Sequence, residues 1–307
     1  MRRLLIVYNP NSTNYKRVKT EVFPRIKAIK GYQVGKFAIE KTSFESNVIR
    51  LAEFLADTDI VISAGGDATS AISANAIVTS GKDVTLGVLP YGTFNDLART
   101  LGTMKYEDVF PLRSASVHAL YPLDIMVDGI HWRYATCYVT MGMTAESVAI
   151  FDEPKFRHYM QKGHKSSWRS YLALATWYFK NRHKKQFIPD FSLNGQATRS
   201  GTSDYCAISG RSMCRVMKGA NDYLKPKIFR SETCRLTSFP RLFKLMVASI
   251  FVRVPGSDTT RDVIKFNAPA IVNLQAEGES CTFEGVRSLT IAKSPHPLKV
   301  ITKEKQK

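Results

Sequence analysis

Two glycine-rich loops constrain the fold of this chain most strongly. The segments Ala64–Thr69 and Leu89–Asp96 each follow a short apolar run, and each leads into a segment with helical character. Apolar runs of this length are typical of strands buried in a parallel sheet. Phosphates bind where a strand, a glycine turn and a helix N-terminus meet, because glycine admits close approach and the first helical N–H groups lack helical partners. Two such loops in one α/β region predict a nucleotide site.

The first third of the chain alternates strand and helix signals. Apolar runs separated by helical segments imply a parallel sheet with right-handed crossovers, and ligands then bind beyond the carboxyl ends of the strands. Both glycine loops would lie at that edge. The expected strands are 4–8, 33–39, 60–63 and 84–89, and the expected helices are 15–30, 44–55, 69–80 and 95–101.

The pattern changes near residue 120. Short segments with β-branched or aromatic content, separated by turn residues, predict an antiparallel β-sandwich. One helix, expected over 168–185, interrupts them and ends in a basic run. We therefore expect two domains, 1–122 and 123–296. The expected strands of the second domain are 132–140, 191–194, 205–209, 263–266, 271–275 and 288–292.

The formal net charge is +18, and it is concentrated in one stretch. Residues 155–185 contain nine Lys or Arg and no Asp or Glu. Such a stretch attracts an anionic leaflet or nucleic acid, and the plain alternative is a solvated face. The helix within it could rest on a membrane or pack its apolar stripe on the sandwich.

The chain shows no sign of secretion or of a membrane span. No apolar run reaches the roughly 18 residues that a spanning helix needs, and the apolar start of the chain stops at Asn9 and Pro10. The five cysteines form no C-x-x-C pair, which favours reduced thiols in the cytoplasm, or simply buried apolar residues.

Four motifs in order give a resemblance to a known family. They are Asn9-Pro10-Asn11-Ser12-Thr13, Gly65-Gly66-Asp67-Ala68-Thr69, the ten residues from Pro90 to Arg99, and Glu277-Gly278-Glu279. At these residues the chain resembles the bacterial diacylglycerol-kinase-like lipid kinases, whose superfamily includes the sphingosine kinases. The third motif is specific, whereas G-G-D is shared with NAD kinases and phosphofructokinases.

The resemblance implies a fold and a reaction. The fold would be a Rossmann-like, three-layer α/β nucleotide domain, to which residues 297–307 return, and a C-terminal antiparallel β-sandwich for the lipid substrate. The reaction would transfer the γ-phosphoryl group of ATP, with Mg²⁺, to a lipid hydroxyl such as that of diacylglycerol. A positioned carboxylate would accept the hydroxyl proton, and Glu279 is the expected general base. Asp67 would face the metal-nucleotide or the acceptor hydroxyl.

The resemblance also implies which residues bind the nucleotide, and most of them have a structural alternative. The Asn9 loop could be an ordinary βα loop, Thr42 a helix N-cap, Asp67 a turn or cap residue, and Glu277–Glu279 a charged turn. Asn95 and Asp96 would cap the following helix and buttress the first glycine loop, and Arg99 would pair with an acid. The expected nucleotide-binding residues are Asn9, Pro10, Asn11, Ser12, Thr13, Thr42, Gly65, Gly66, Asp67, Ala68, Thr69, Ser70, Ala71, Gly92, Thr93 and Asn95.

Two departures from the family pattern bear on activity. Ala68 stands where the family has glycine; if that position needs a positive φ, alanine costs about 1–2 kcal/mol, and its methyl group could crowd the phosphates. The family's D-D-G segment, which helps to bind a structural Mg²⁺, is absent near Asn221–Leu224. We therefore expect no metal beyond the Mg²⁺ that accompanies ATP.

Three functions remain open at this stage. The first is an ATP-dependent lipid kinase, peripheral at the cytoplasmic side of the inner membrane through residues 155–185. The second is a weak or inactive homologue that binds nucleotide or lipid, and the third is a soluble kinase of the NAD-kinase type. Nucleic-acid binding rests on charge alone, so no nucleic-acid partner is expected. The acceptor lipid and the oligomeric state, including a homodimer, stay open.

Overall fold

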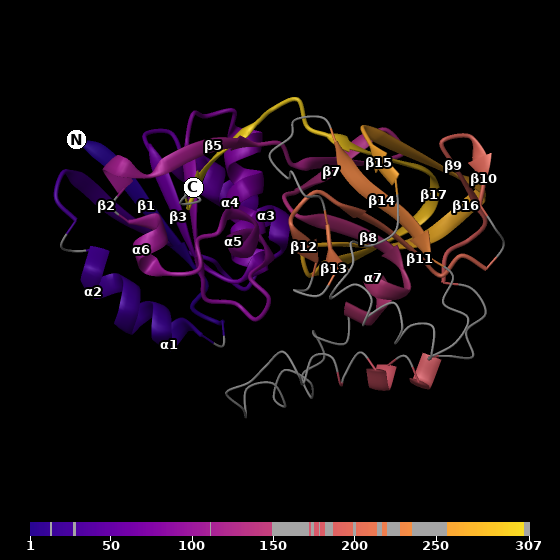
Figure 1. Ribbon diagram of the computed structural model, residues 1–307, viewed down its shortest axis with the longest axis horizontal. Coiled ribbons are helices and arrows are strands. Elements are labelled where there is room, and N and C mark those ends of the chain that lie inside the picture. The colour runs from indigo at the N-terminus through magenta and orange to yellow at the C-terminus, as the bar shows by residue number, and fades with distance from the viewer. Residues whose placement is uncertain are drawn as a thin grey trace. The chain divides into compact units, whose positions relative to one another are not determined.

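The computed structural model falls into two units (Figure 1). The first comprises Met1–Pro122 and the described part of Ser294–Lys307, and the second lies within Leu123–Asn221 and Lys227–Lys293. The structure describes residues 1–12, 14–26, 29–110, 112–148, 172, 175–177, 179–181, 187–198, 201–213, 217–219, 228–234 and 257–303.

The first unit is built on a six-stranded sheet in the order β2-β1-β3-β4-β18-β5. All neighbours are parallel except β18 and β5, which are antiparallel. The predicted α/β class with a parallel sheet is confirmed. The strands are β1 (Arg2–Tyr8), β2 (Tyr32–Ala38), β3 (Ile60–Gly65), β4 (Thr85–Pro90), β5 (Ser116–Leu120) and β18 (Leu298–Thr302).

Helices cover both faces of this sheet. Adjacent side chains of a strand point to opposite faces. Ile62 packs in one apolar cluster with Val18 and Val22, while the neighbouring Ser63 bonds to Ser70 on α4 at 3.1 Å. The sheet therefore forms the middle of three layers. The helical elements are α1 (Tyr15–Arg17), η1 (Val18–Val22), α2 (Phe23–Ile26), α3 (Phe44–Phe54), α4 (Asp67–Ser80), α5 (Asp96–Leu101), α6 (Tyr106–Val109) and η2 (Leu112–Ser114).

The helix expected over 15–30 is described as three consecutive pieces. Its middle piece, η1, is a π-helical turn in which the N–H of Phe23 donates to the carbonyl of Val18. Pro24 follows directly, and proline has no N–H to donate and crowds the preceding turn. The proline is thus the physical reason for the wider turn.

The second unit is an antiparallel sheet curved around one apolar core. Its main path is β15-β14-β11-β8-β16-β17-β6-β7, and residues of β6, β8, β11, β16 and β17 meet in a single buried cluster. The antiparallel second domain is confirmed. Its elements are β6 (Leu123–Val127), β7 (Ile130–Ala135), β8 (Tyr138–Gly142), α7 (Met143–Val148), β9 (Phe191–Leu193), β10 (Gln196–Ala197), β11 (Asp204–Ile208), β12 (Ser212–Met213), β13 (Met217–Lys218), β14 (Phe229–Cys234), β15 (Ser257–Thr259), β16 (Arg261–Ala276) and β17 (Glu279–Lys293).

Two predictions of strand limits in this unit were wrong. The expected strands 263–266 and 271–275 are one long strand, β16, whose register against β17 shifts on both sides of Ala270. Pro269 cannot donate to the ladder, so the strand bends there without ending. The expected strand 132–140 is instead β7 and β8, separated at Thr136 and Cys137.

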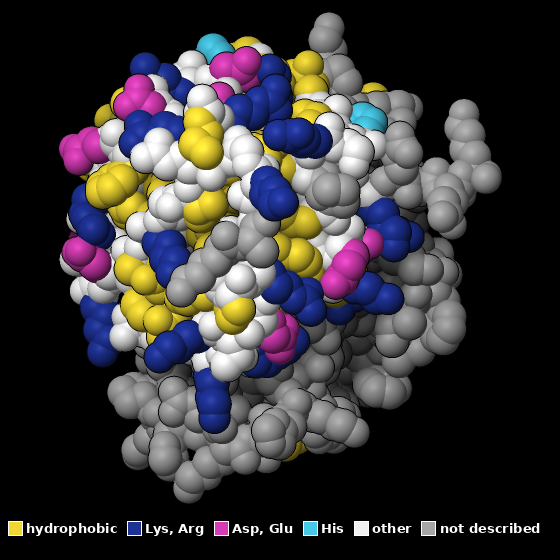
Figure 2. Space-filling view, turned by 90° about the vertical axis from the view of Figure 1, so that its left-hand side faces the viewer, with side chains coloured by type: hydrophobic (Ala, Val, Ile, Leu, Met, Phe, Trp, Pro, Cys, Tyr) yellow, Lys and Arg dark blue, Asp and Glu magenta, His cyan; other side chains and the backbone are white. Residues whose placement is uncertain are grey.

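The predicted basic segment 155–185 lies largely outside the described residues. Within it, Leu172, residues 175–177 and residues 179–181 are helical. Among the described helices, none has the length and apolar character to cross a membrane. Figure 2 shows one face of the molecule, on which Lys and Arg side chains are interspersed with Asp and Glu.

Candidate functional site

The two glycine-rich loops touch each other through their backbones. They follow β3 and β4, which are adjacent in the sheet, and the N–H of Tyr91 donates to the carbonyl of Gly65 at 2.9 Å. A Cβ placed on Gly92 would overlap the Cα of Gly66, and a Cβ on Gly66 would lie 3.1 Å from the Cα of Gly92. A side chain on either residue would fill the space between the loops, so glycine is needed for this close approach.

Asp67 joins the same two loops through its carboxylate. Its oxygens accept from the N–H groups of Asn95 at 2.9 Å and Asp96 at 2.7 Å, at the start of α5. The sequence predicted that Asn95 and Asp96 would buttress the first loop, and both residues bond to that loop through the carboxylate of Asp67. Asn95 is the N-cap residue of α5 and has φ of 56°, and its side chain bonds within its own loop, to Gly92 at 2.7 and 2.9 Å.

The Asn9 loop lies beside the second glycine loop. The amide of Asn14 donates to the carbonyl of Tyr91 at 2.9 Å, a link that the sequence did not predict. The side chain of Asn9 accepts from the N–H of Asn11 at 2.8 Å and forms a tight turn. The Oγ of Ser12 is buried and has no hydrogen-bond partner in the described part of the chain. Thr13 lies outside the described residues.

Helix α4 begins directly at the first glycine loop. Gly66 is its N-cap and has no side chain to satisfy the free N–H groups of the first turn. Ser70 and Ala71, expected to bind nucleotide, are 3% and 1% exposed and pack inside the unit. Thr69 is also buried, against Gly65. These buried side chains support the first glycine loop by packing inside the unit.

The concern that Ala68 strains the backbone was wrong. Ala68 is the second residue of α4, and it is not among the residues with a positive φ. Alanine favours a helix more than glycine does, because glycine loses more backbone entropy. The residue therefore brings no left-handed strain to the loop.

The remaining predicted residues around these loops have mixed outcomes. Ser43, not Thr42, caps α3, accepting from the N–H of Ser46 at 3.0 Å. The hydroxyl of Thr42 accepts instead from Asn47 at 3.0 Å. Arg99 was expected to pair with an acid, but its Nε donates to the carbonyl of Phe94 at 3.0 Å. Thr93 is half-buried in the second loop.

A network that the sequence did not reveal supports the second loop from beneath. The hydroxyl of Tyr91 donates to Glu21 at 3.1 Å, and Glu21 pairs with Arg17 at 3.0 Å. Burial, aided by the charge of Glu21, raises the pKa of Tyr91 to about 12. Tyr91 therefore stays protonated. Its hydroxyl donates to Glu21 and so holds the second glycine loop in place.

In the second unit, the Glu277–Glu279 turn connects β16 to β17. Glu277 has φ of 52° and is 4% exposed. Its Oε1 accepts from the N–H of Cys137 at 2.6 Å and from the hydroxyl of Thr136. Glu279, the predicted base, is the more exposed of the two. Glu277 therefore anchors the turn, and Glu279 is the carboxylate that a substrate could reach.

A partly buried lysine, Lys293, lies at the far end of β17. The ammonium of Lys293 donates to the hydroxyl of Ser209. Burial lowers its pKa to about 8, and the neighbouring Cys137 opposes that shift. Because Cys137 also donates to Glu277, the turn and Lys293 adjoin the same bend between β7 and β8.

Comparison with known proteins finds a family that the first unit resembles. Residues 3–126 match the model of the diacylglycerol kinase catalytic domain. Through these residues the chain is similar to the diacylglycerol-kinase-like lipid kinases. It is 31% identical over 128 residues to a diacylglycerol kinase of Bacillus subtilis, a match that covers 41% of each chain. It is 34% identical over 105 residues to one of Staphylococcus epidermidis, covering 33% of this chain and 32% of the relative.

These sequence matches span about two fifths or less of the relatives' length, whereas the structural match spans nearly all of both chains. A crystal structure described as a diacylglycerol kinase from Bacillus anthracis superposes with a TM-score of 0.68, covering 98% of this chain and 97% of that one. The identity is 14%, so this likeness establishes the shared fold. Residues 221–224, where a metal-binding segment was sought, lie outside the described residues.

Proposed function

We propose that this protein is an ATP-dependent lipid kinase that transfers the γ-phosphoryl group of ATP to a lipid hydroxyl. One observation carries the proposal: the backbone contact between Gly66 and Gly92, in loops that the Asn14–Tyr91 bond joins to the segment containing the unpartnered hydroxyl of Ser12. A backbone lining without side chains leaves room for a polyphosphate, and the N-terminus of α4 favours negative charge. The names of the related proteins support a lipid as the acceptor.

The residues at these loops fit a nucleotide polyphosphate. Ser12 offers a donor that lacks a partner, and the N-terminus of α4 opens at Gly66. Mg²⁺ would arrive with ATP and neutralise the charge of its phosphates. Asp67 is a carboxylate at this position that could share the metal with the phosphates. Its bonds to Asn95 and Asp96 fix its orientation beforehand.

The second unit would supply the base. A lipid hydroxyl is a weak nucleophile until a carboxylate accepts its proton, an effect of about 10²–10⁴-fold. Glu279 takes this role in the proposal, because it is accessible while Glu277 is buried and hydrogen-bonded. We further propose a diacylglycerol-like acceptor, reached by association of residues 155–185 with the anionic cytoplasmic leaflet.

A labelling experiment tests the proposal. The full chain is incubated with γ-labelled ATP, Mg²⁺ and a total lipid extract, and in parallel with NAD. We expect label in a lipid whose mass increases by one phosphate. Label in NAD, or Mg·ATP binding without any phosphorylated lipid, would overturn it. Gly81→Ala is the matched control for a loop variant at Gly92, because Gly81 lies at the far end of α4 with nothing within 4 Å of an added Cβ.

A further inference from the structure

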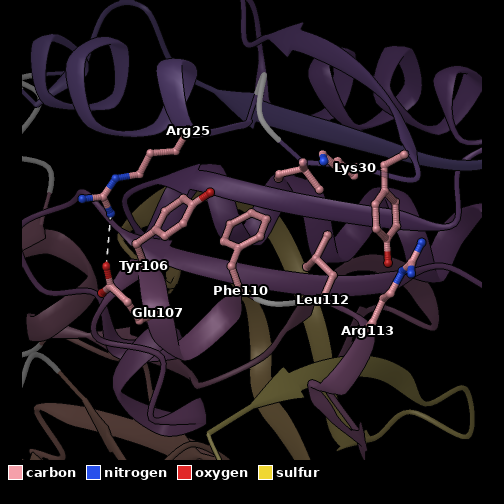
Figure 3. Close-up of a pocket in the computed structure, with 9 residues that line it drawn as sticks. Arg25, Lys30, Tyr106, Glu107, Phe110, Leu112 and Arg113 are labelled. Carbon is pink, nitrogen blue, oxygen red and sulfur yellow. Dashed lines mark hydrogen bonds and ion pairs between the residues drawn. The ribbon is translucent and has the colours of Figure 1, made fainter.

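A cavity lies in the first unit, away from the glycine loops. It has a volume of about 550 Å³ and is lined from α2, β2, α6 and η2 (Figure 3). Tyr32, which lines it, pairs with Arg2 at the amino end of the parallel strands, whereas Gly65 lies at the carboxyl end of β3. The length of a strand, about 20 Å, therefore separates the cavity from the candidate nucleotide site. Its lining residues are Arg25, Ile29, Lys30, Tyr32, Tyr106, Glu107, Phe110, Leu112 and Arg113.

The cavity has an apolar floor. Figure 3 shows Tyr106, Phe110 and Leu112 in a row along it. The rings of Tyr106 and Phe110 stack with centroids 4.3 Å apart, which gives the floor a rigid aromatic section. Such a lining favours a ligand with an extended apolar part.

The charges at the two ends of this floor differ. At the Tyr106 end, Arg25 pairs with Glu107 at 3.2 Å and lies over the ring of Tyr106. At the Leu112 end are Lys30 and Arg113, and neither has an ion-pair partner within the described residues. One end is thus neutralised within the protein, while the other presents two uncompensated cations.

The hydroxyl of Tyr32 gives an independent indication of a missing ligand. Tyr32 is 7% exposed, and its hydroxyl is buried without a hydrogen-bond partner in the part of the chain that the structure covers. A buried hydroxyl without a partner is costly, and such groups normally bond to protein, water or ligand. The guanidinium of Arg113 lies against Gly31, the residue before Tyr32, so the hydroxyl and the free cations belong to one end of the cavity.

We propose that this cavity binds a single-chain amphiphilic anion, with its carboxylate or phosphate at Lys30 and Arg113 and its acyl chain along Leu112, Phe110 and Tyr106. Lys30 and Arg113 would form charge-assisted hydrogen bonds to such a head group, and the apolar floor would remove the acyl chain from water. The proposal concerns binding only and does not rest on the kinase activity.

Calorimetric titration of the full chain with decyl phosphate and decanoate, below their micelle concentrations, tests this. We expect saturable binding of both, at least about tenfold weaker binding of butyl phosphate, and weak or no binding of decanol and inorganic phosphate. Equal affinity for butyl and decyl phosphate, or for inorganic phosphate, would show attraction by surface charge and overturn the proposal.

Two double variants locate the site. Lys30→Ala with Arg113→Ala should weaken decyl phosphate at least about tenfold, whereas Lys16→Ala with Lys19→Ala, which removes the same charge from exposed positions on α1 and η1, should change it less than about twofold. If both double variants bind decyl phosphate equally well, the anion binds elsewhere and the proposal is wrong.

Tyr32→Phe and vesicles complete the test. Tyr32→Phe should raise the melting temperature of the ligand-free chain and lower affinity for decyl phosphate, since it removes the unpartnered hydroxyl without changing the ring. Sedimentation with phosphatidylcholine–phosphatidylglycerol vesicles separates a dissolved amphiphile from a bilayer. If the Lys30/Arg113 variant loses only vesicle binding, the cations recognise a membrane surface and the cavity proposal fails.

Discussion

The glycine loops of the first unit and the Glu277 turn of the second are held by the same kind of hydrogen bond, but they offer different groups to a ligand. In both, a carboxylate accepts from backbone N–H groups of another segment, Asp67 from Asn95 and Asp96, and Glu277 from Cys137. Around Asp67 the surface offered to a ligand is backbone, because Gly66 and Gly92 leave no room for side chains. Around Glu277 it is a side chain, Glu279. The first site should therefore be sensitive to added atoms, and the second to lost charge.

The largest effect expected from this contrast is at Glu279. Glu279→Gln keeps the size of the side chain but removes the base, so turnover should fall about 10²–10⁴-fold with little change in stability. Initial rates of lipid phosphorylation and urea unfolding measure both. Glu277→Ala should instead destabilise the second unit by about 1–3 kcal/mol, because it removes the acceptor of Thr136 and Cys137. Full turnover in Glu279→Gln would refute its assignment as base.

The next largest effect is expected at Gly92. The added methyl group of Gly92→Ala overlaps Gly66, so the loops must separate at a cost of about 1–3 kcal/mol, and Mg·ATP should bind at least about tenfold more weakly. A Mg·ATP titration monitored by thermal shift gives both values. Gly81→Ala, with a φ of 63° but open space, should lower stability alone. Equal ATP affinity in the two variants would argue against a phosphate site at the loops.

An intermediate effect is expected from Lys293. Its folded pKa of about 8 lies below the ordinary 10.5, so between these values the unfolded chain binds more protons than the folded one. Stability therefore rises with pH across this window, by on the order of 1–3 kcal/mol. Lys293→Met should flatten that rise and stabilise the protein at neutral pH. Urea unfolding at several pH values measures how the free energy of unfolding changes with pH. If this dependence is the same in the variant, folding does not lower the pKa of Lys293.

The smallest effect is expected at Ala68. Since the residue is helical, Ala68→Gly should cost up to about 1 kcal/mol of stability and leave Mg·ATP affinity within about twofold. A thermal-shift series on the variant measures both quantities. A large rise in turnover would mean that the methyl group of Ala68 crowds the phosphates. The space at the glycine loops would then be smaller than Gly66 and Gly92 indicate.

The difference between the two regions also explains what could be predicted from sequence. The strand–loop–helix order and both glycine loops are local patterns, and the α/β class with a parallel sheet followed from them. The direction of the Asp67 bonds did not, because a motif shows which residues occur together and not which of them donates. Similarly, Thr42 was the possible N-cap of α3 in the sequence, and only the geometry shows that Ser43 takes this place by accepting from the N–H of Ser46.

The second unit was harder because its contacts are distant in sequence. Thr136 and Cys137 lie about 140 positions before Glu277, as the separations of 141 and 140 residues show. No periodicity marks such a pair. The length of β16 was missed because a local signal was misleading. Pro269 is typical of a strand end, but the pairing with β17 continues on both sides of it.

Strand β18 has a consequence for how the chain is made. It is inserted between β4 and β5, pairing with Leu86 on one side and with Ala119 on the other, although it follows the entire second unit in sequence. A ribosome therefore releases β4 and β5 long before the strand that joins them. Until residues 298–302 emerge, the first unit has a gap in its sheet, so the glycine loops reach their final support only after the other unit has been synthesised.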